Sequence, residues 1–261
     1  MPKEFKFKAT FGSKLSKVHS AEMDKYLALG GLDKIKSLVP KEVDLGENPD
    51  LIAVVGNAAI GNRTNLNYDC ISNATAVAIA KHFTWKYVDV DHNRGRVIGV
   101  ICNTGLSTFG SNKPITEEEA LKTEEPINIS LAMLLYRTVL KPAFITLLEE
   151  SVDETSPNFG KLSLSWEILF HDYDIAVGPD RNLSTAKIYK EGKERDELEN
   201  LLPQNKGTGK KEADFVYRVI GKETLIPAAV GIVEDPAAEV KGLAIVDGSD
   251  KSTITVSSDA I

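Results

Sequence analysis

The chain has 261 residues, of which 42% are hydrophobic and 26% charged, enough apolar material for one large domain or two small ones. A formal net charge of −7 argues against a general nucleic-acid-binding protein, because neutralising phosphates requires a surplus of lysine and arginine. The two cysteines, Cys70 and Cys102, form neither a disulfide framework nor a CxxC metal motif, and no apolar run is long enough to span a bilayer. We therefore expect a soluble cytosolic protein that binds neither nucleic acid nor membrane, and we predict no cofactor and no metal.

The chain divides into three parts by composition. Residues 1–45 are charged and carry a short helical pattern over residues 21–39, which Pro40 ends, so we predict a peripheral N-terminal segment. Residues 46–242 contain the apolar runs and form the predicted domain. Within it, residues 186–211 are rich in lysine, glutamate and glycine, which indicates an exposed insertion. Residues 243–261 are rich in serine, threonine and aspartate and are typical of a flexible tail.

Short strands alternate with a few helices along the predicted domain. Ser72 or Asn73 can cap a helix that runs to about residue 83, and residues 142–152 also read as a helix, whereas residues 127–136 fit either type. Residues 93–95 read as a turn between two strands. The predicted strands are residues 51–56, 87–92, 96–102, 161–170, 215–220 and 225–233. This order indicates an α+β fold rather than a doubly wound sheet.

Four histidines are candidates for acid–base chemistry: His19, His82, His92 and His171. His92 stands at the end of a predicted strand, behind Asp89 and Asp91. A histidine in such a place is most often structural, and a general base also needs a nucleophile within hydrogen-bond reach.

Hydroxyl and carboxylate side chains alternate along one predicted strand. Ser163, Ser165 and Glu167 are spaced by two residues, so they share one face of the strand. Buried polar groups each need a partner, so this row is either a solvated outer face or a site.

Four landmarks resemble, in their order and spacing, the tailed-phage prohead proteases and the herpesvirus assemblin proteases. Residues 88–99 (VDVDHNRGRVIG) resemble the histidine motif of these families, and residues 62–80 are similar to the segment that precedes it. The Ser165-Trp-Glu167 strand is similar to their serine strand, and residues 228–238 to their closing strand and Pro-Ala turn. The resemblance covers roughly residues 50–240.

The resemblance implies a mostly antiparallel β-barrel with surrounding helices and a serine nucleophile served by histidine. His92 is then the general base and Ser165 the nucleophile, with Ser163 as the alternative nucleophile. For the third catalytic member we name Glu167 first, with Asp172 and Glu223 as alternatives, because Ala229 occupies the place where some relatives carry a glutamate.

The resemblance further implies that the protein cleaves capsid and scaffold proteins and itself, within the assembling procapsid in the host cytoplasm. Several phage relatives cut after glutamate in a small–x–Glu context, and this chain contains such strings at residues 20–22 and 237–239. We predict self-cleavage after Glu22, Glu239 or both, with Glu239 preferred. Assemblins are activated by dimerisation, so a homodimer is a further expectation.

Two other classes of function stay open. The chain could be a non-catalytic capsid or scaffold component on a protease-like fold, or an unrelated cytosolic Ser/His hydrolase. The absence of a Gly-x-Ser-x-Gly elbow disfavours the second class. A metal-dependent hydrolase is disfavoured further, because no second histidine lies at ligand spacing from Asp89, Asp91 and His92.

Overall fold

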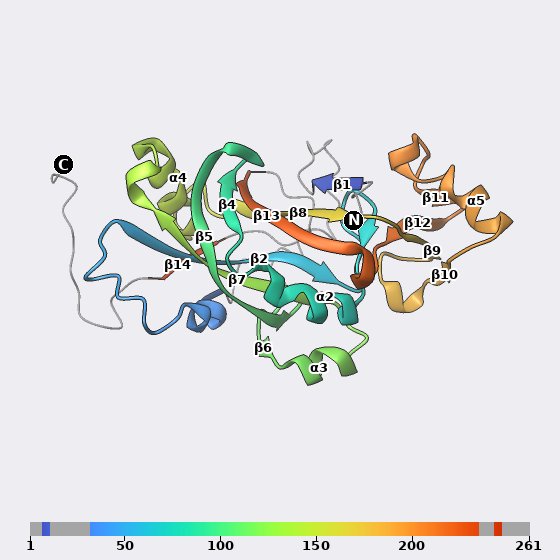
Figure 1. Cartoon of the computed structure of the whole chain (residues 1–261), viewed down its shortest axis with the longest axis horizontal. Helices are drawn as coiled ribbons and strands as arrows, with labels where there is room; N and C mark the ends of the chain where they lie inside the picture. Colours follow the sequence, from blue (N-terminus) through green and yellow to red (C-terminus); the bar gives the residue numbers. More distant parts are fainter. Residues whose placement is uncertain (1–6, 11–31, 235–242, 247–261) are drawn as a thin grey trace, which may run out of the picture.

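The computed structural model describes residues 7–10, 32–234 and 243–246, and these residues form an α+β fold with two sheets (Figure 1). The large sheet has the strand order β1-β8-β13-β4-β5-β7-β2-β14, with β6 beside β5. Its strands are β1 (Phe7–Thr10), β2 (Leu51–Gly61), β4 (Tyr87–Val90), β5 (Asn93–Thr108), β6 (Pro114–Ile115), β7 (Ile127–Tyr136), β8 (Ser163–Phe170), β13 (Leu225–Val233) and β14 (Ala244–Val246).

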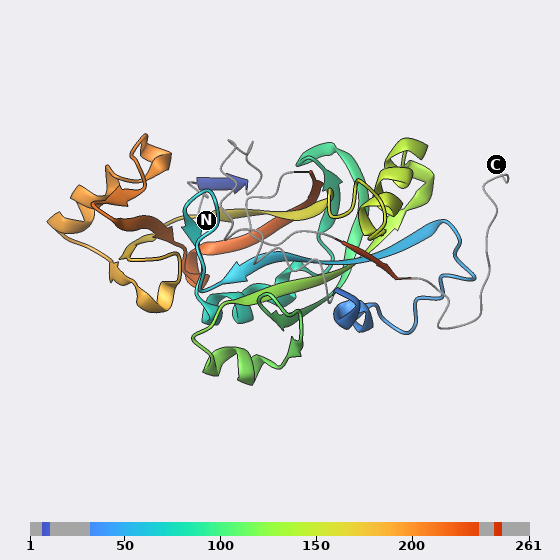
Figure 2. The ribbon, with the colours of Figure 1, turned by 180° about the vertical axis from the view of Figure 1, so that it is seen from behind.

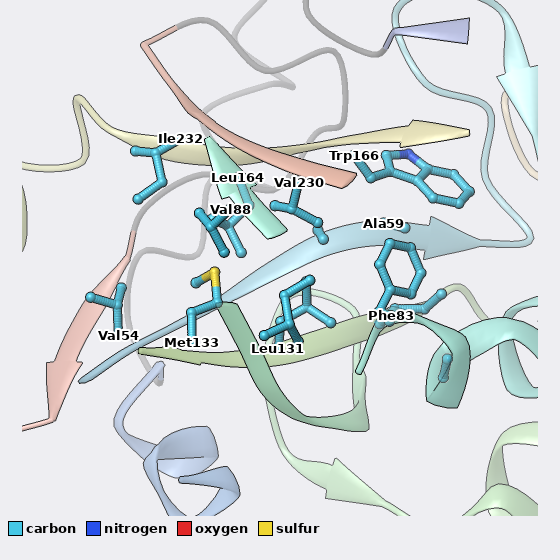
Figure 3. Close-up of a cluster of buried hydrophobic side chains, with 14 of the residues drawn as sticks. Val54, Ala59, Phe83, Val88, Leu131, Met133, Leu164, Trp166, Val230 and Ile232 are labelled. Carbon is cyan, nitrogen blue, oxygen red and sulfur yellow. The ribbon is translucent and has the colours of Figure 1, made fainter. Parts of the chain in front are cut away.

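The large sheet curves over its main apolar core, and a smaller apolar cluster around Ile35 packs against Val55 and Ala132 of the same sheet. Figure 3 shows Val54 and Met133 of β2 and β7 facing Leu164 and Ile232 of β8 and β13, with Val88 of β4 among them. Gly56 makes the close approach of β2 and β8 feasible, because a Cβ at this position would meet Leu164 Cδ1 at 3.1 Å.

The curved sheet is not shown to be a closed barrel. Hydrogen bonding among the described residues runs as an open path from β1 to β14, so the α+β class is confirmed and barrel closure is not. Every neighbouring pair on this path is antiparallel except β13 with β4.

Helices cover one end and one side of the curved sheet (Figure 1). The Ser72 hydroxyl caps α2 (Asn73–Ala80) by accepting a hydrogen bond from the Thr75 N–H, as its sequence predicts. A capping box between Thr116 and Glu119 starts α3 (Glu117–Lys122), and Pro142 occupies the first turn of α4. The remaining helical elements of this part are η1 (Leu32–Leu38), η2 (Lys81–Phe83), η3 (Arg137–Val139) and α4 (Pro142–Val152).

A smaller sheet of five strands lies at the other end of the molecule from α4 (Figure 1). The buried pair of Arg218 and Asp69, 2.6 Å apart, joins two of its strands, and the Arg218 guanidinium also lies 5.2 Å from the ring centre of Phe170. Its elements are β3 (Asp69–Cys70), β9 (Asp174–Gly178), η4 (Leu183–Thr185), β10 (Lys187–Tyr189), α5 (Lys193–Glu199), η5 (Pro203–Asn205), β11 (Lys210–Lys211), β12 (Asp214–Val219) and η6 (Lys222–Thr224).

The structure departs from the expected division of the chain in three places. Strand β1 lies at the edge of the large sheet beside β8, although we expected residues 1–45 to be peripheral. Strand β14 pairs with β2, seen from behind in Figure 2, although we assigned residues 243–261 to a flexible tail. Residues 186–211 form part of the small sheet and bury Leu198 and Leu202 against Ile175 and Val216, so this segment shares a core with β9 and β12 and is not wholly exposed.

None of the helices in the described part of the chain has the length and apolar character that crossing a bilayer requires.

Candidate active site

His92 and Ser165 meet at one face of the large sheet. The imidazole Nε2 lies 2.8 Å from the Ser165 Oγ, although 73 residues separate the two in sequence. This distance is within the range in which a histidine can take a proton from a serine hydroxyl. Ser165 is 1% exposed and His92 is half-buried, so the contact is largely shielded from solvent.

The pleat of β8 directs Ser165 away from the apolar core. Leu164 and Trp166 pack in the core, so the side chains of Ser163, Ser165 and Glu167 project from the opposite face. These three side chains are nevertheless buried, with at most 1% exposed. The expectation that they share a face is confirmed, and the alternative of a solvated outer face is wrong.

The register of three strands sets up the space that the imidazole fills. Ser165 on β8 is the Cα partner of Gly231 on β13, and Gly231 is the partner of Asp89 on β4. Partners in adjacent strands point to the same face, so the row reads hydroxyl, glycine, carboxylate. Because Gly231 has no side chain, the His92 ring fits over the middle of the row, where a Cβ on this glycine would lie 3.1 Å from Nδ1.

The turn that carries His92 has the left-handed backbone conformation at both of its residues. We predicted a turn at residues 93–95, but the turn residues are Asp91 and His92, because Val90 pairs directly with Asn93. Their φ values are 56° and 55°, both positive, as a two-residue type I′ hairpin requires. Glycine and asparagine most often supply this geometry, and aspartate and histidine are among the other residues that adopt it.

Residues 94–96 form a bulge instead of the predicted turn, since β5 advances from Asn93 to Val97 while β4 advances by a single residue. The bulge directs Arg94 toward β8, where its Nη2 donates a hydrogen bond to Glu167 Oε1 at 2.7 Å. Arg94 also hydrogen-bonds the Tyr87 hydroxyl.

The structure places the three acids proposed as third member away from the His92 ring or in other contacts. Glu167 forms an ion pair with Arg94 and lies opposite Ala229 in the β8–β13 register. Asp172 follows the end of β8, and its main-chain carbonyl accepts a hydrogen bond from the Thr224 hydroxyl. Glu223 is largely exposed and lies 3.8 Å from the ammonium of Lys222.

A fourth acid, Asp89, lies next to the imidazole, and we did not propose it from the sequence as a third member. Its carboxyl accepts a hydrogen bond from the His92 backbone N–H. The pKa of Asp89 is raised to about 6, chiefly because burial disfavours the charged form and secondly because Glu167 is negatively charged. The available signal was an aspartate between two valines, Val88 and Val90, on a strand whose alternate residues enter the core.

The other sequence candidates do not join this site. Ser163 pairs with Val233, one pleat away on β8, whereas the His92 Nε2 lies 2.8 Å from the Ser165 Oγ. Both cysteines are free thiols. The described residues hold no group of three His, Cys, Asp or Glu side chains arranged to bind a metal ion.

Comparison with protein-family models, with curated proteins and with solved structures finds no match for this chain.

Proposed function

We propose that this chain is a serine endopeptidase of the prohead-maturation type, with Ser165 as nucleophile and His92 as general base. The observation that carries the proposal is the 2.8 Å contact between His92 Nε2 and Ser165 Oγ. Two residues that the resemblance selected, one in a turn and one on a strand, are 73 positions apart and meet at the distance that proton transfer needs. The predominantly antiparallel, strongly curved sheet is compatible with the barrel of that class, and barrel closure is part of the proposal.

The proposed reaction is acyl transfer. Ser165 Oγ attacks the carbonyl carbon of the scissile peptide while its proton moves to His92 Nε2. The tetrahedral intermediate collapses, the C–N bond breaks, and the imidazolium returns the proton to the leaving amine. Water, deprotonated by His92, then hydrolyses the acyl-enzyme and regenerates the Ser165 hydroxyl.

The proposed substrates are capsid and scaffold proteins and the chain itself, inside an assembling procapsid in the host cytoplasm, with a homodimer as the proposed active form. The proposed self-cleavage positions after Glu22 and Glu239 lie outside the described residues. The burial of Ser165 in this structure means that a substrate must displace whatever covers the hydroxyl before attack can occur.

Intact-mass spectrometry of the purified full chain over time tests this function. The wild type should lose fragments whose masses match cleavage after glutamate, whereas Ser165→Ala should keep its full mass. Ser163→Ala is the matched control, because it removes a neighbouring hydroxyl from the same strand face, and it should cleave like the wild type. Identical, unchanging masses in all three would argue for a non-catalytic capsid or scaffold component.

A further inference from the structure

Asp89 is a buried carboxylate that the dyad described above does not use. Its residue is 1% exposed, and its Oδ1 has no hydrogen-bond partner within the part of the chain that the structure describes. Val88 and Val90 on either side of it belong to the apolar core. Burying a carboxylate with an unsatisfied oxygen costs free energy, so its presence at this position calls for a reason other than stability.

Asp89 lies beside the turn that carries His92 and is joined to it by one hydrogen bond. Its carboxyl accepts a hydrogen bond from the His92 backbone N–H, which ties the turn to the end of β4. Its Oδ1 also shares the space above Gly231 with the imidazole: a Cβ on this glycine would lie 3.0 Å from Asp89 Oδ1 and 3.1 Å from His92 Nδ1. The carboxylate therefore lies on the side of the ring opposite the Ser165 contact.

This placement suits the charge that forms during the proposed reaction. When Nε2 takes the Ser165 proton, the imidazole becomes a cation whose second nitrogen faces the Asp89 side of the site. A fixed negative charge in a poorly solvated place stabilises that cation and needs no rearrangement at the moment of transfer. The hydrogen bond to the backbone N–H also fixes the turn from which the imidazole reaches the Ser165 hydroxyl.

We propose that Asp89 is the positioning residue of the Ser165–His92 pair, holding the His92 turn through its backbone N–H and supporting the imidazolium with its charge. This inference rests on the proposed function. It replaces Glu167 as the third member, because Glu167 is engaged with Arg94.

The charged groups around Asp89 come from three directions. Glu167 faces it from β8, Asp91 from the turn and Arg94 from β5. The two acids and burial raise the pKa of Asp89, while Arg94 and the His92 N–H lower it, leaving it at about 6. The carboxylate is therefore charged at the pH at which a histidine base works and neutral in more acidic solution.

The test measures how fast a fluorophosphonate labels Ser165 between pH 5 and pH 9. Asp89→Asn keeps the shape and an oxygen for the His92 N–H but removes the charge. We expect the labelling rate at pH 8 to fall at least about tenfold, and the midpoint of the pH–rate profile to move to lower pH, because an imidazolium without its carboxylate loses its proton more readily. Asp89→Ala also removes the hydrogen bond to the turn and should label more slowly still.

Glu194→Gln is the matched control, because it removes the charge of an acid on α5, beside the small sheet and outside the site. The Glu194 side chain is 53% exposed and 3.8 Å from Lys211, so solvent screens it and the profile should stay in place. A wild type labelled at Ser165 together with an Asp89→Asn rate and midpoint equal to wild type would overturn the role of Asp89 and leave the proposed function standing. Failure of the wild type to label at Ser165 would overturn both.

Discussion

The backbone of Gly231 lies against the ring of His92, so closely that a methyl group added to this glycine would come within 3.1 Å of both the imidazole Nδ1 and the His92 backbone nitrogen. Gly231 is also the strand partner of Ser165. The His92 ring can therefore reach Ser165 because Gly231, on the neighbouring strand β13, has no side chain to fill the space that the ring occupies.

Gly231→Ala should therefore separate the dyad. The added Cβ would also lie 3.0 Å from Asp89 Oδ1, so the turn must move outward and Nε2 must leave hydrogen-bond distance of the Ser165 hydroxyl. We expect fluorophosphonate labelling to fall by roughly a hundredfold or more, since a misplaced base loses most of its contribution. Gly221→Ala is the control, because a Cβ at Gly221 meets nothing within 4 Å, and it should label normally. Equal labelling in both variants would contradict the packing described here.

Asp89→Asn should raise the free energy of unfolding of the protein while it lowers the rate of labelling at Ser165. Folding raises the pKa of Asp89 from 3.8 to about 6, so the folded state holds this proton more tightly than the unfolded chain does. The charged carboxylate therefore destabilises the fold above about pH 6, and the penalty disappears below about pH 4. At ~1.4 kcal/mol per pKa unit, the variant should gain up to about 3 kcal/mol in free energy of unfolding at pH 8.

Urea unfolding at pH 8 and at pH 4 checks this expectation. The difference between Asp89→Asn and wild type should be large at pH 8 and close to zero at pH 4. A residue with only a structural role would show the reverse sign, because its removal would destabilise the fold. Loss of stability at pH 8 would count against Asp89 as a group kept for chemistry at the expense of stability.

Arg218→Ala should destabilise the protein in a way that depends on pH. The variant leaves the Asp69 carboxylate buried without its guanidinium partner and removes the contact with the Phe170 ring. We expect a loss of about 3 kcal/mol in free energy of unfolding at pH 7. Burial already raises the pKa of Asp69, and without Arg218 it rises further, so the loss should shrink as the pH falls and Asp69 takes up a proton. Chemical unfolding at pH 7 and pH 5 measures it, and a loss independent of pH would show that the ion pair is not its cause.

Glu167→Gln tests whether Glu167 or Asp89 is the third member of the site beside Ser165 and His92. Glu167 is held by Arg94, so its neutral amide should slow labelling at Ser165 less than Asp89→Asn does. Because the charge of Glu167 raises the pKa of Asp89, the variant should also keep Asp89 ionised to lower pH. The same pH-dependent labelling measures both effects. A larger loss of labelling rate in Glu167→Gln than in Asp89→Asn would show that Glu167 is the third member instead.

The sequence predicts the elements of this fold well where local patterns decide them. The cap at Ser72, the helix beginning at Pro142 and the strands on either side of the site are in place, because capping and alternation act over a few residues. The pairing of β14 with β2 and of β1 with β8 was not predicted, since edge strands of three or four residues carry too little pattern to distinguish them from tails.

The candidate site was predictable in part. His92 and Ser165 could be named, and the structure places the His92 Nε2 2.8 Å from the Ser165 Oγ. Asp89 and Gly231 could not, because their importance follows from the β8–β13–β4 register, which no local pattern encodes. The turn was misplaced by two residues because Asp91 and His92 adopt positive φ, whereas Asn-Arg-Gly carries the usual turn residues.

The most direct test of the account is to find which residue a fluorophosphonate modifies in the full-length protein. Peptide mass spectrometry after labelling at pH 8 should place the phosphonyl group on Ser165, with fluoride as the leaving group. The modification should be lost in His92→Ala and kept in His82→Ala, whose histidine is exposed on another part of the surface. Absence of label on Ser165 in the wild type, or label that persists at full rate in His92→Ala, would contradict the proposed dyad.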